Sequence, residues 1–280
     1  MNERNIIAII AIAIVAVGLA FLWNENRSDE RFVIKMEASS RDIRVGEPVD
    51  LSFSFKDRKE WGPPDLLIDH ERIVHVIIIG EDFNEFFHIH PEDLGVVTAE
   101  MKEKGRYTVR FTPQKAGKYL IAVDARALVG YMSKQFMIEV SGEPKMVLAE
   151  KDNSREGVFN GYTVSLAVPE SVVTGEEVIL AYKIMKDARP TIDLTPYLGA
   201  PMHLAVVADD LGTFFHTHGQ ITGSAAALGS EHAAHEPLPK FFGPAIEARA
   251  MFTQAGLYHV FGELTRGKEK ILTQFQIEVQ

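Results

Sequence analysis

The most informative stretch is His75-Val-Ile-Ile-Ile-Gly-Glu-Asp-Phe-Asn-Glu-Phe-Phe-His88-Ile-His90, because the second half of the chain repeats it. The repeat reads His203-Leu-Ala-Val-Val-Ala-Asp-Asp-Leu-Gly-Thr-Phe-Phe-His216-Thr-His218. In each copy a histidine is followed thirteen residues later by His-x-His, with an acidic pair and Phe-Phe at matched positions. A β-branched run, a polar turn and an aromatic run predict a β-hairpin in each copy.

Each hairpin places three histidines on one face of a sheet. Side chains two residues apart on a strand point the same way, as His88 and His90 must. If residues 80–83 close the turn, His75 lies opposite His88, and if residues 80–85 close it, His75 lies opposite His90. Cross-strand neighbours share a face, so both registers bring the three imidazoles of a copy together.

Three convergent neutral imidazoles suit copper, zinc, nickel or iron. The alternative is a set of core or rim histidines that are hydrogen-bonded to the backbone. Because the spacing survives in two copies that differ at most intervening positions, we favour metal binding. Copper is the first choice, since Cu(II) heads the divalent affinity series for nitrogen ligands, and zinc is the second. The predicted ligands are His75, His88, His90, His203, His216 and His218.

Five further residues are auxiliary candidates. Asp124 and Glu263 occupy matched positions, where a carboxylate could orient a ligand histidine, or where it could be an exposed sheet residue. His232 and His235 lie in a small-residue insertion of the second copy, which is either a solvated loop or a lid ordered by metal. Met202 precedes His203 and therefore points to the opposite face, where core packing competes with a role as a soft Cu(I) ligand.

Composition excludes several classes of function. The 280 residues, 46% of them apolar, are enough for two domains of about 120 residues, each with its own core. A net charge of -10 leaves no basic surface for nucleic acid. The absence of cysteine excludes disulfides, thiolate zinc sites and the cysteine-containing copper site of electron-transfer proteins. The sequence contains neither a nucleophile elbow nor a glycine-rich phosphate loop, so it has none of these motifs that indicate an enzyme.

The N-terminus predicts a membrane segment. Residues 6–23 contain no charge over eighteen positions, which as a helix span about 27 Å, close to the bilayer core. A cleaved signal peptide is the alternative, with Gly18-Leu-Ala20 as a faint cleavage site. In both cases the rest of the chain would lie outside the cytoplasm, in the periplasm or at the cell surface, and we favour a single-pass anchor.

The remaining chain predicts an all-β architecture of two tandem immunoglobulin-like β-sandwich domains. Short alternating strands follow one another with turn signals between them, and Gly117-Lys-Tyr119 and Gly256-Leu-Tyr258 resemble the tyrosine corner of such sandwiches. A repeat of about 130 residues is a duplicated domain rather than a solenoid unit. The predicted division is an anchor or signal peptide at 1–27, domain 1 at 28–142, a linker or start of domain 2 at 143–157, and domain 2 at 158–280.

The second copy resembles bacterial extracytoplasmic immunoglobulin-like modules of the YtkA-like and copper-resistance-associated kind. The residues that carry the resemblance are Tyr197-Leu-Gly-Ala200, His203, Asp210 and His216-Thr-His218, and it covers residues 160–280. The first copy keeps His88-Ile-His90-Pro91 but has Asp69-His-Glu-Arg72 in place of Tyr-Leu-Gly-Ala, while the second has Gly219 in place of the motif's proline. The resemblance implies a sandwich fold, an envelope location and the same six histidines.

These observations predict a membrane-anchored extracytoplasmic protein that binds and handles a transition metal, with the metal ion, the membrane and an envelope protein as partners and no nucleic acid. One alternative is a structural or scaffolding module in which the histidines only fix the hairpins. Another is a hydrolytic enzyme that uses an open position on a three-histidine metal.

Overall fold

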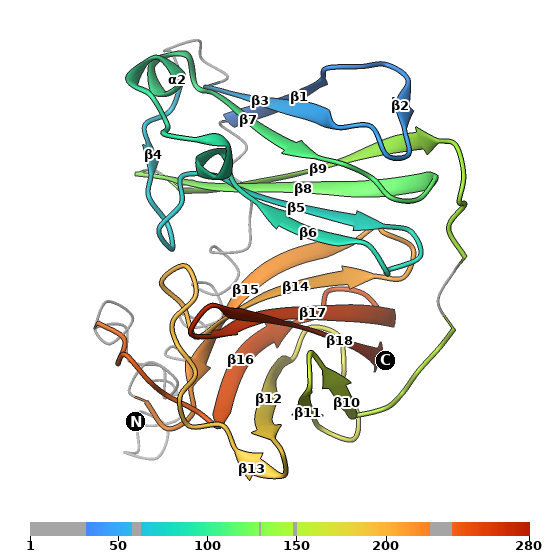
Figure 1. The fold of residues 1–280 in the computed structure, drawn as a ribbon, viewed down its shortest axis with the longest axis vertical. Helices are drawn as coiled ribbons and strands as arrows, with labels where there is room; N and C mark the ends of the chain where they lie inside the picture. Colours follow the sequence, from blue (N-terminus) through green and yellow to red (C-terminus); the bar gives the residue numbers. More distant parts are fainter. Residues whose placement is uncertain (1–31, 58–62, 129, 148–149, 225–236) are drawn as a thin grey trace, which may run out of the picture. The chain divides into compact units, whose positions relative to one another are not determined.

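The computed structural model describes residues 32–57, 63–128, 130–147, 150–224 and 237–280, and this part of the chain is built almost wholly from β-strands (Figure 1). It divides into unit 1, with residues up to 80 and 85–146, and unit 2, with residues 81–84 and 147–280. The predicted all-β fold and two-domain repeat are confirmed. The apolar run at 6–23 lies outside the described residues, and within them no helix has the length and hydropathy needed to cross a membrane.

Unit 1 is a β-sandwich of two sheets around one apolar core. Its elements are β1 (Phe32–Ala38), β2 (Ile43–Arg44), β3 (Val49–Asp57), β4 (Leu66–Leu67), β5 (His75–Gly80), β6 (Phe86–Ile89), the 3-10 helix η1 (Pro91–Leu94), α2 (Ala99–Lys104), β7 (Arg106–Phe111), β8 (Gly117–Ala127) and β9 (Gly130–Ser141). One sheet has the order β1-β3-β7, and the other has the order β2-β9-β8-β5-β6 with β4 paired to β8. Both sheets contribute side chains to the core, among them Phe53 and Ile121.

Unit 2 repeats this plan with one difference. Its strands are β10 (Glu156–Phe159), β11 (Tyr162–Ala167), β12 (Glu177–Lys186), β13 (Arg189–Pro190), β14 (Met202–Ala208), β15 (Phe214–Ile221), β16 (Ala245–Met251), β17 (Gly256–Arg266) and β18 (Glu269–Val279). They follow the order β10-β11-β12-β16-β15-β14-β17-β18, with β13 paired to β12. The long strand β15 pairs with β14 up to Gly219 and then with β16 at Gln220 and Ile221, so it joins two layers that are separate sheets in unit 1.

Matched strands show why the two copies fold alike. In β3 the side chains alternate, with Val49, Leu51, Phe53 and Phe55 buried, and β12 has the same period-two pattern. Strand periodicity of two puts every second residue in the core, so the pattern fixes the register of both strands. The glycines that precede them have φ angles of 78° and 79°, which glycine adopts without steric cost.

Both sandwiches contain the tyrosine corner expected from Gly-x-Tyr. The Tyr119 hydroxyl donates to the Lys115 carbonyl oxygen at 2.8 Å, and the Tyr258 hydroxyl donates to the Gln254 carbonyl oxygen at 3.0 Å. In unit 1 the same hydroxyl also contacts the buried Glu85 carboxylate. The corners are therefore structural, and the one in unit 1 has an additional ionic partner.

The two corners differ enough to predict different mutational costs. Tyr258→Phe is expected to lower the free energy of unfolding by about 1 kcal/mol, because one hydrogen bond is lost. Tyr119→Phe is expected to cost about 2 kcal/mol, because a buried carboxylate also loses a donor. Urea unfolding of the full chain measures both values, and a cost for Tyr119→Phe no larger than that for Tyr258→Phe would contradict a stabilising role for the contact with Glu85.

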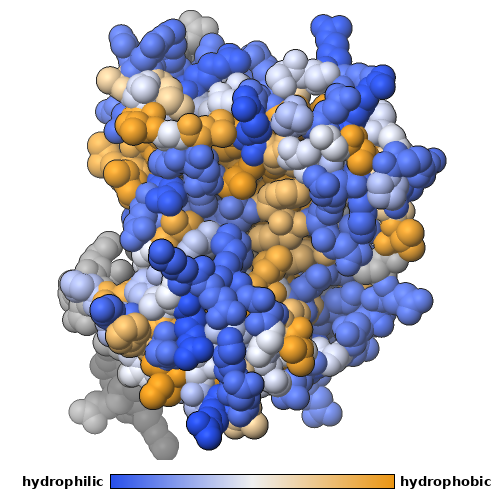
Figure 2. All heavy atoms as spheres, in the orientation of Figure 1, coloured by the Kyte–Doolittle hydropathy of each residue, from blue (hydrophilic) through white to orange (hydrophobic). Residues whose placement is uncertain are grey.

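Polar side chains cover most of the face seen in Figure 2, with apolar side chains scattered between them. The exposed large apolar residues include Ile68, Val96 and Leu128 in unit 1 and Val158 and Ile192 in unit 2. Single exposed apolar side chains are ordinary for a soluble domain, so they do not by themselves mark an interface.

Candidate metal centre

The predicted hairpins are present, and the structure selects one of the two registers. In β5 and β6, Val76 pairs with Ile89 and Ile79 with Phe86, which puts His75 opposite His90. In β14 and β15, His203 pairs directly with His218. Both copies therefore use the wider turn, and the third histidine, His88 or His216, lies diagonally across on the same face.

The acidic residues of the hairpin turns form the turns themselves. Asp82 Oδ1 accepts a hydrogen bond from the Asn84 backbone at 3.0 Å, and Asp210 Oδ1 accepts one from the Gly212 backbone at 2.8 Å. An aspartate that bonds the backbone two residues ahead is common turn chemistry. These carboxylates are thus structural, and they fix the turn length that aligns the histidines.

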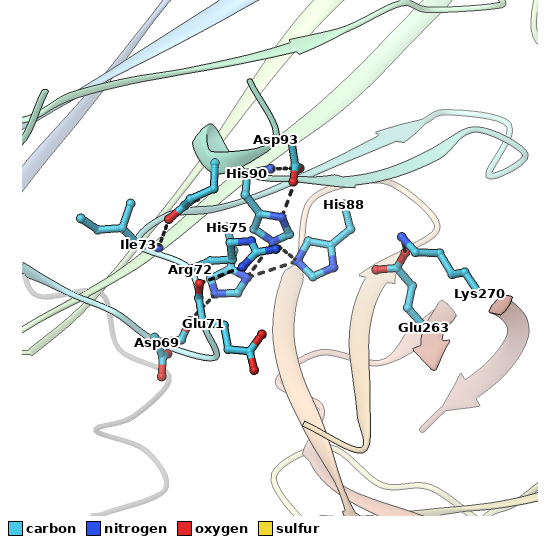
Figure 3. A network of polar contacts seen from close by, with 11 residues as sticks. Asp69, Glu71, Arg72, Ile73, His75, His88, His90, Asp93, Glu263 and Lys270 are labelled. Atoms are coloured by element: carbon cyan, nitrogen blue, oxygen red, sulfur yellow. Dashed lines mark hydrogen bonds and ion pairs between the residues drawn. The ribbon is translucent and has the colours of Figure 1, made fainter. Parts of the chain in front are cut away.

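The three rings of unit 1 meet at their nitrogens (Figure 3). His75 Nδ1 lies 3.2 Å from His88 Nε2 and 3.3 Å from His90 Nε2, and the last two nitrogens are 3.1 Å apart. His75 and His90 are buried, with exposed fractions of 4% and 2%. An ion at the usual zinc–imidazole distance of roughly 2.0–2.1 Å from all three nitrogens would lie just off their plane. The nitrogens therefore have the spacing of a three-imidazole metal site.

The outer ring nitrogens fix the tautomers of two of these histidines. His75 Nε2 donates to the Asp69 carbonyl oxygen at 3.0 Å, and His90 Nδ1 lies 3.3 Å from Asp93 Oδ2. Carbonyl and carboxylate oxygens only accept, so each of these nitrogens carries the proton and the inner nitrogen of a neutral ring carries a lone pair. Two lone pairs 3.3 Å apart cannot bond each other, but both face His88 Nε2, at 3.2 and 3.1 Å. A His88 ring protonated at Nε2 would donate to them, and a cation among the three nitrogens would bind all three lone pairs. Outer donation to an oxygen is typical of metal-ligating histidines.

Asp93 reaches His90 because the chain turns sharply after it. Pro91 ends the strand and begins η1, so that Asp93 also accepts the His90 backbone N–H at 2.8 Å. Burial tends to raise the pKa of the Asp93 carboxyl, but the hydrogen bonds from His90 and the charge of Arg72 outweigh it, and the pKa is lowered. Asp93 therefore stays ionised beside the His90 ring.

The first histidine of each triad is oriented by the same tight turn. Asp69 and Arg72 exchange backbone hydrogen bonds of 2.8 and 2.9 Å, and Tyr197 and Ala200 exchange bonds of 2.9 and 3.1 Å. The central residues have positive φ angles in both turns, as in a type I′ turn. The Tyr197 carbonyl oxygen accepts a hydrogen bond from His203 Nε2 at 2.9 Å, as the Asp69 carbonyl oxygen does from His75 Nε2. The first copy thus departs from the Tyr-Leu-Gly-Ala motif in sequence but keeps its backbone conformation.

This turn predicts that glycine is favoured over other residues at its third position in both units. Glu71 has a φ of 64°, which costs roughly 1 kcal/mol for a non-glycine residue, so Glu71→Gly is expected to stabilise unit 1 by about 0.5 kcal/mol. Gly199 at φ 74° is the matched control, and Gly199→Ala is expected to destabilise unit 2 by about 1 kcal/mol. Thermal unfolding compares the variants, and destabilisation by Glu71→Gly would contradict the type I′ assignment.

The three rings of unit 2 lie at similar spacings, but their nitrogens do not converge as closely as those of His75, His88 and His90. The ring centroids of unit 2 are 5.6 Å apart for His203 and His216, and 4.7 Å apart for each pair that includes His218. His203 Nδ1 lies 3.4 Å from His216 Nε2. Here glycine replaces the proline at position 219, where a Cβ would lie 2.6 Å from Ile246 Cγ2. Without the proline, strand β15 continues past this position. No counterpart of η1 follows His218, since the strand runs on to Ile221.

Both predicted carboxylates lie beside the first histidine. Asp124 is the direct cross-strand partner of His75, and Glu263 is that of His203. Each is only 3% exposed, so the alternative of an exposed sheet residue is wrong. Each is also bonded by the side chain seven residues later: Asp124 by the Tyr131 phenol and Glu263 by the Lys270 ammonium at 2.7 Å. These carboxylates face other partners and are not themselves ligands in the structure.

The other auxiliary candidates do not join the triads. Met202 belongs to the hydrophobic core of unit 2, and its Cε occupies the space that a Cβ on Gly262 would need. Its thioether is therefore a packing group, and the soft-ligand alternative is wrong. His232 and His235 lie outside the described residues.

Sequence reasoning did not identify three side chains of the site: Asp93, Tyr131 and Lys270. Tyr131 and Lys270 could have been identified from the sequence, because each follows its matched carboxylate by seven residues. For Asp93 the signal was the proline that follows His90. A further histidine, His259, is buried and is bonded through Nε2 to Asp209 at 2.8 Å.

Comparison with solved structures finds matches at low identity. They include a mutant of Salmonella alpha-2-macroglobulin (11% identity, TM-score 0.29, covering 90% of this chain and 16% of that chain) and the Escherichia coli adhesin FdeC (12%, 0.24, 88% and 64%). The D0-D1 domain of intimin is a third (8%, 0.23, 88% and 100%). The chain thus spans 16% of the macroglobulin, and similarity at this level carries no argument about function.

No curated protein matches the chain. At the level of families, residues 28–142 and residues 157–280 each match the family described as a domain of unknown function, DUF8832. Together the two matches cover most of the 280 residues and separate at the short segment between the sandwiches. The chain therefore belongs to the DUF8832 family, of which it carries two tandem copies.

Proposed function

We propose that this protein binds a transition-metal ion through the histidine triad of each unit and buffers it or passes it on at the outer side of a membrane. The observation that carries the proposal is the triangle of ring nitrogens in unit 1, whose sides are 3.1 to 3.3 Å. The outer hydrogen bonds of His75 and His90 leave the inner nitrogens of the neutral rings as lone-pair donors, which supports binding of a cation.

The donor set favours copper first and zinc second. Three neutral nitrogens without thiolate are borderline ligands, for which Cu(II) has the highest affinity among the divalent first-row ions. Zinc is well served by three histidines and a fourth ligand from solvent or a partner. The absence of cysteine from the sequence disfavours electron transfer by a blue-copper site, so binding and delivery fit the chain better than redox catalysis.

Location and partners are part of the same proposal. The uncharged run at 6–23 is long enough to anchor the chain in a membrane, with both sandwiches outside the cytoplasm. An anchored metal-binding protein would meet envelope partners by lateral diffusion. The resemblance to YtkA-like and copper-resistance-associated modules supports this location.

The direct test is a calorimetric titration of the full chain, purified in detergent, with Cu(II) and with Zn(II) at neutral pH. We expect saturable binding with up to two ions per chain and a preference for Cu(II). Failure to take up either metal would refute the proposal and leave the structural module as the better account. Elemental analysis of the protein as isolated identifies the ion that it carries in the cell.

A further inference from the structure

We propose that the side chain seven residues after the buried carboxylate, Tyr131 in unit 1 and Lys270 in unit 2, determines the metal affinity of each triad, so that unit 1 holds the tighter site. This inference rests on the proposed function, because it concerns the same histidines. It adds that the two copies have different affinities and names the residues responsible.

Register places these residues at equivalent positions. Asp124 is opposite His75 and Glu263 is opposite His203, at the direct cross-strand position. Tyr131 pairs with Arg126, and Lys270 pairs with Thr265. Arg126 and Thr265 each follow the carboxylate by two residues, so Tyr131 and Lys270 lie on the same sheet face as the carboxylate. The carboxylate therefore lies between the first histidine and the variable residue in both units.

The two variable residues leave different charges beside the ring. Lys270 Nζ lies 2.7 Å from Glu263 Oε1, so the ammonium compensates the carboxylate charge. Burial and the neighbouring Asp124 carboxylate raise the pKa of the Tyr131 phenol, so Tyr131 is neutral and brings no charge to compensate the carboxylate opposite His75. A carboxylate near a ligand histidine strengthens binding of a dication by direct attraction and by making the imidazole more basic.

Lys270 is also placed to repel a cation. Its ammonium lies 4.8 Å from the centroid of the Tyr197 ring, which packs edge-on against His203 with centroids 5.6 Å apart. In unit 1, Arg72 acts on Asp93 and Arg126 lies 3.9 Å from Asp69, and Asp93, which has no counterpart after His218, adds to the difference between the units in the same direction. At the position beside the matched carboxylates, the difference in charge between the units is that of Lys270.

The test exchanges the two residues in single-site versions of the full chain. With the triad of unit 1 removed (His75→Ala, His88→Ala, His90→Ala), Lys270→Tyr is expected to tighten Cu(II) and Zn(II) binding about tenfold in chelator competition titrations. With the triad of unit 2 removed (His203→Ala, His216→Ala, His218→Ala), Tyr131→Lys is expected to weaken binding about tenfold. Cu(II) EPR of the same samples should shift on exchange, because the charge next to a ligand ring changes.

Conservative variants separate charge from packing. Lys270→Arg keeps the charge and should retain the wild-type affinity, whereas Lys270→Met removes the charge at similar length and should tighten binding as Lys270→Tyr does. Tyr131→Phe removes the hydrogen bond without adding charge, and its affinity should change less than threefold. If Lys270→Arg and Lys270→Met behave alike, or if the exchange leaves both affinities unchanged while the wild type still binds metal, the inference is wrong and the proposed function stands. A wild-type chain that takes up no metal overturns both.

Discussion

Replacing His88 and His90 together with alanine is expected to abolish metal binding in unit 1 and to leave one bound ion per chain. The change removes two of the three nitrogens that lie within 3.3 Å of one another and leaves His75 as a single ligand. Removal of outer partners alone typically weakens a metal site 10- to 100-fold, so the loss of two direct ligands should exceed about 100-fold. Elemental analysis and calorimetry of the full chain measure both stoichiometry and affinity.

His70 supplies the matched control for this experiment. It lies in the same unit, in the tight turn before His75, and is not part of the triad. His70→Ala should leave the number of bound ions at its wild-type value. The scaffolding alternative predicts the opposite pattern for the double variant, with lower thermal stability and unchanged metal content, so one pair of variants distinguishes the two hypotheses.

Metal should also stabilise the fold, and this is the second large effect. A ligand that binds only the native state raises the free energy of unfolding by about 2.7 kcal/mol when its free concentration is 100 times Kd. For a domain of this size that corresponds to a rise of roughly 10 °C in Tm. The structural reason is that the three ring nitrogens are held within 3.3 Å of one another only in the native state, so the ion would bind the folded chain and not the unfolded one.

Differential scanning calorimetry of the full chain with Cu(II), with Zn(II) and with a chelator checks this effect. The transition of unit 1 should move with metal in the wild type and should not move in the chain that carries His88→Ala and His90→Ala. An equal shift in both proteins would show that the ion binds elsewhere. The Tyr119→Phe variant is a useful second control, because it is expected to lower stability without changing the response to metal.

Much of the site follows from local sequence. The spacing of His75, His88 and His90 predicts a shared face in both registers, because side chains alternate along a strand and pair across it. The sequence left the choice of register open, since it depends on how many residues close the turn. The turn that Asp82 stabilises settled that choice by placing His75 opposite His90.

The sequence did not predict the shared turn that precedes both triads or decide the role of Met202. Asp69-His-Glu-Arg72 has no composition in common with Tyr197-Leu-Gly-Ala200, yet both form the same turn and present a carbonyl oxygen to a ring N–H. In both units the turn comes shortly before the strand that begins with or near the first histidine, β5 or β14. Met202 illustrates the reverse case, because its neighbour His203 made it a candidate ligand while the alternation of β14 placed it in the core.

The all-β class, the duplicated domain and the six histidines follow from local sequence, because they depend on a repeat and on the period-two pattern of single strands. The groups that surround the rings depend instead on long-range strand pairing. Asp124 and Glu263 reach the triads through the pairing of β5 with β8 and of β14 with β17, and Tyr131 and Lys270 through the pairing of β8 with β9 and of β17 with β18. The first two pairings join residues about fifty to sixty positions apart in the chain, and the selection of partners at that distance follows from packing of the inner sheet faces into the core of each unit.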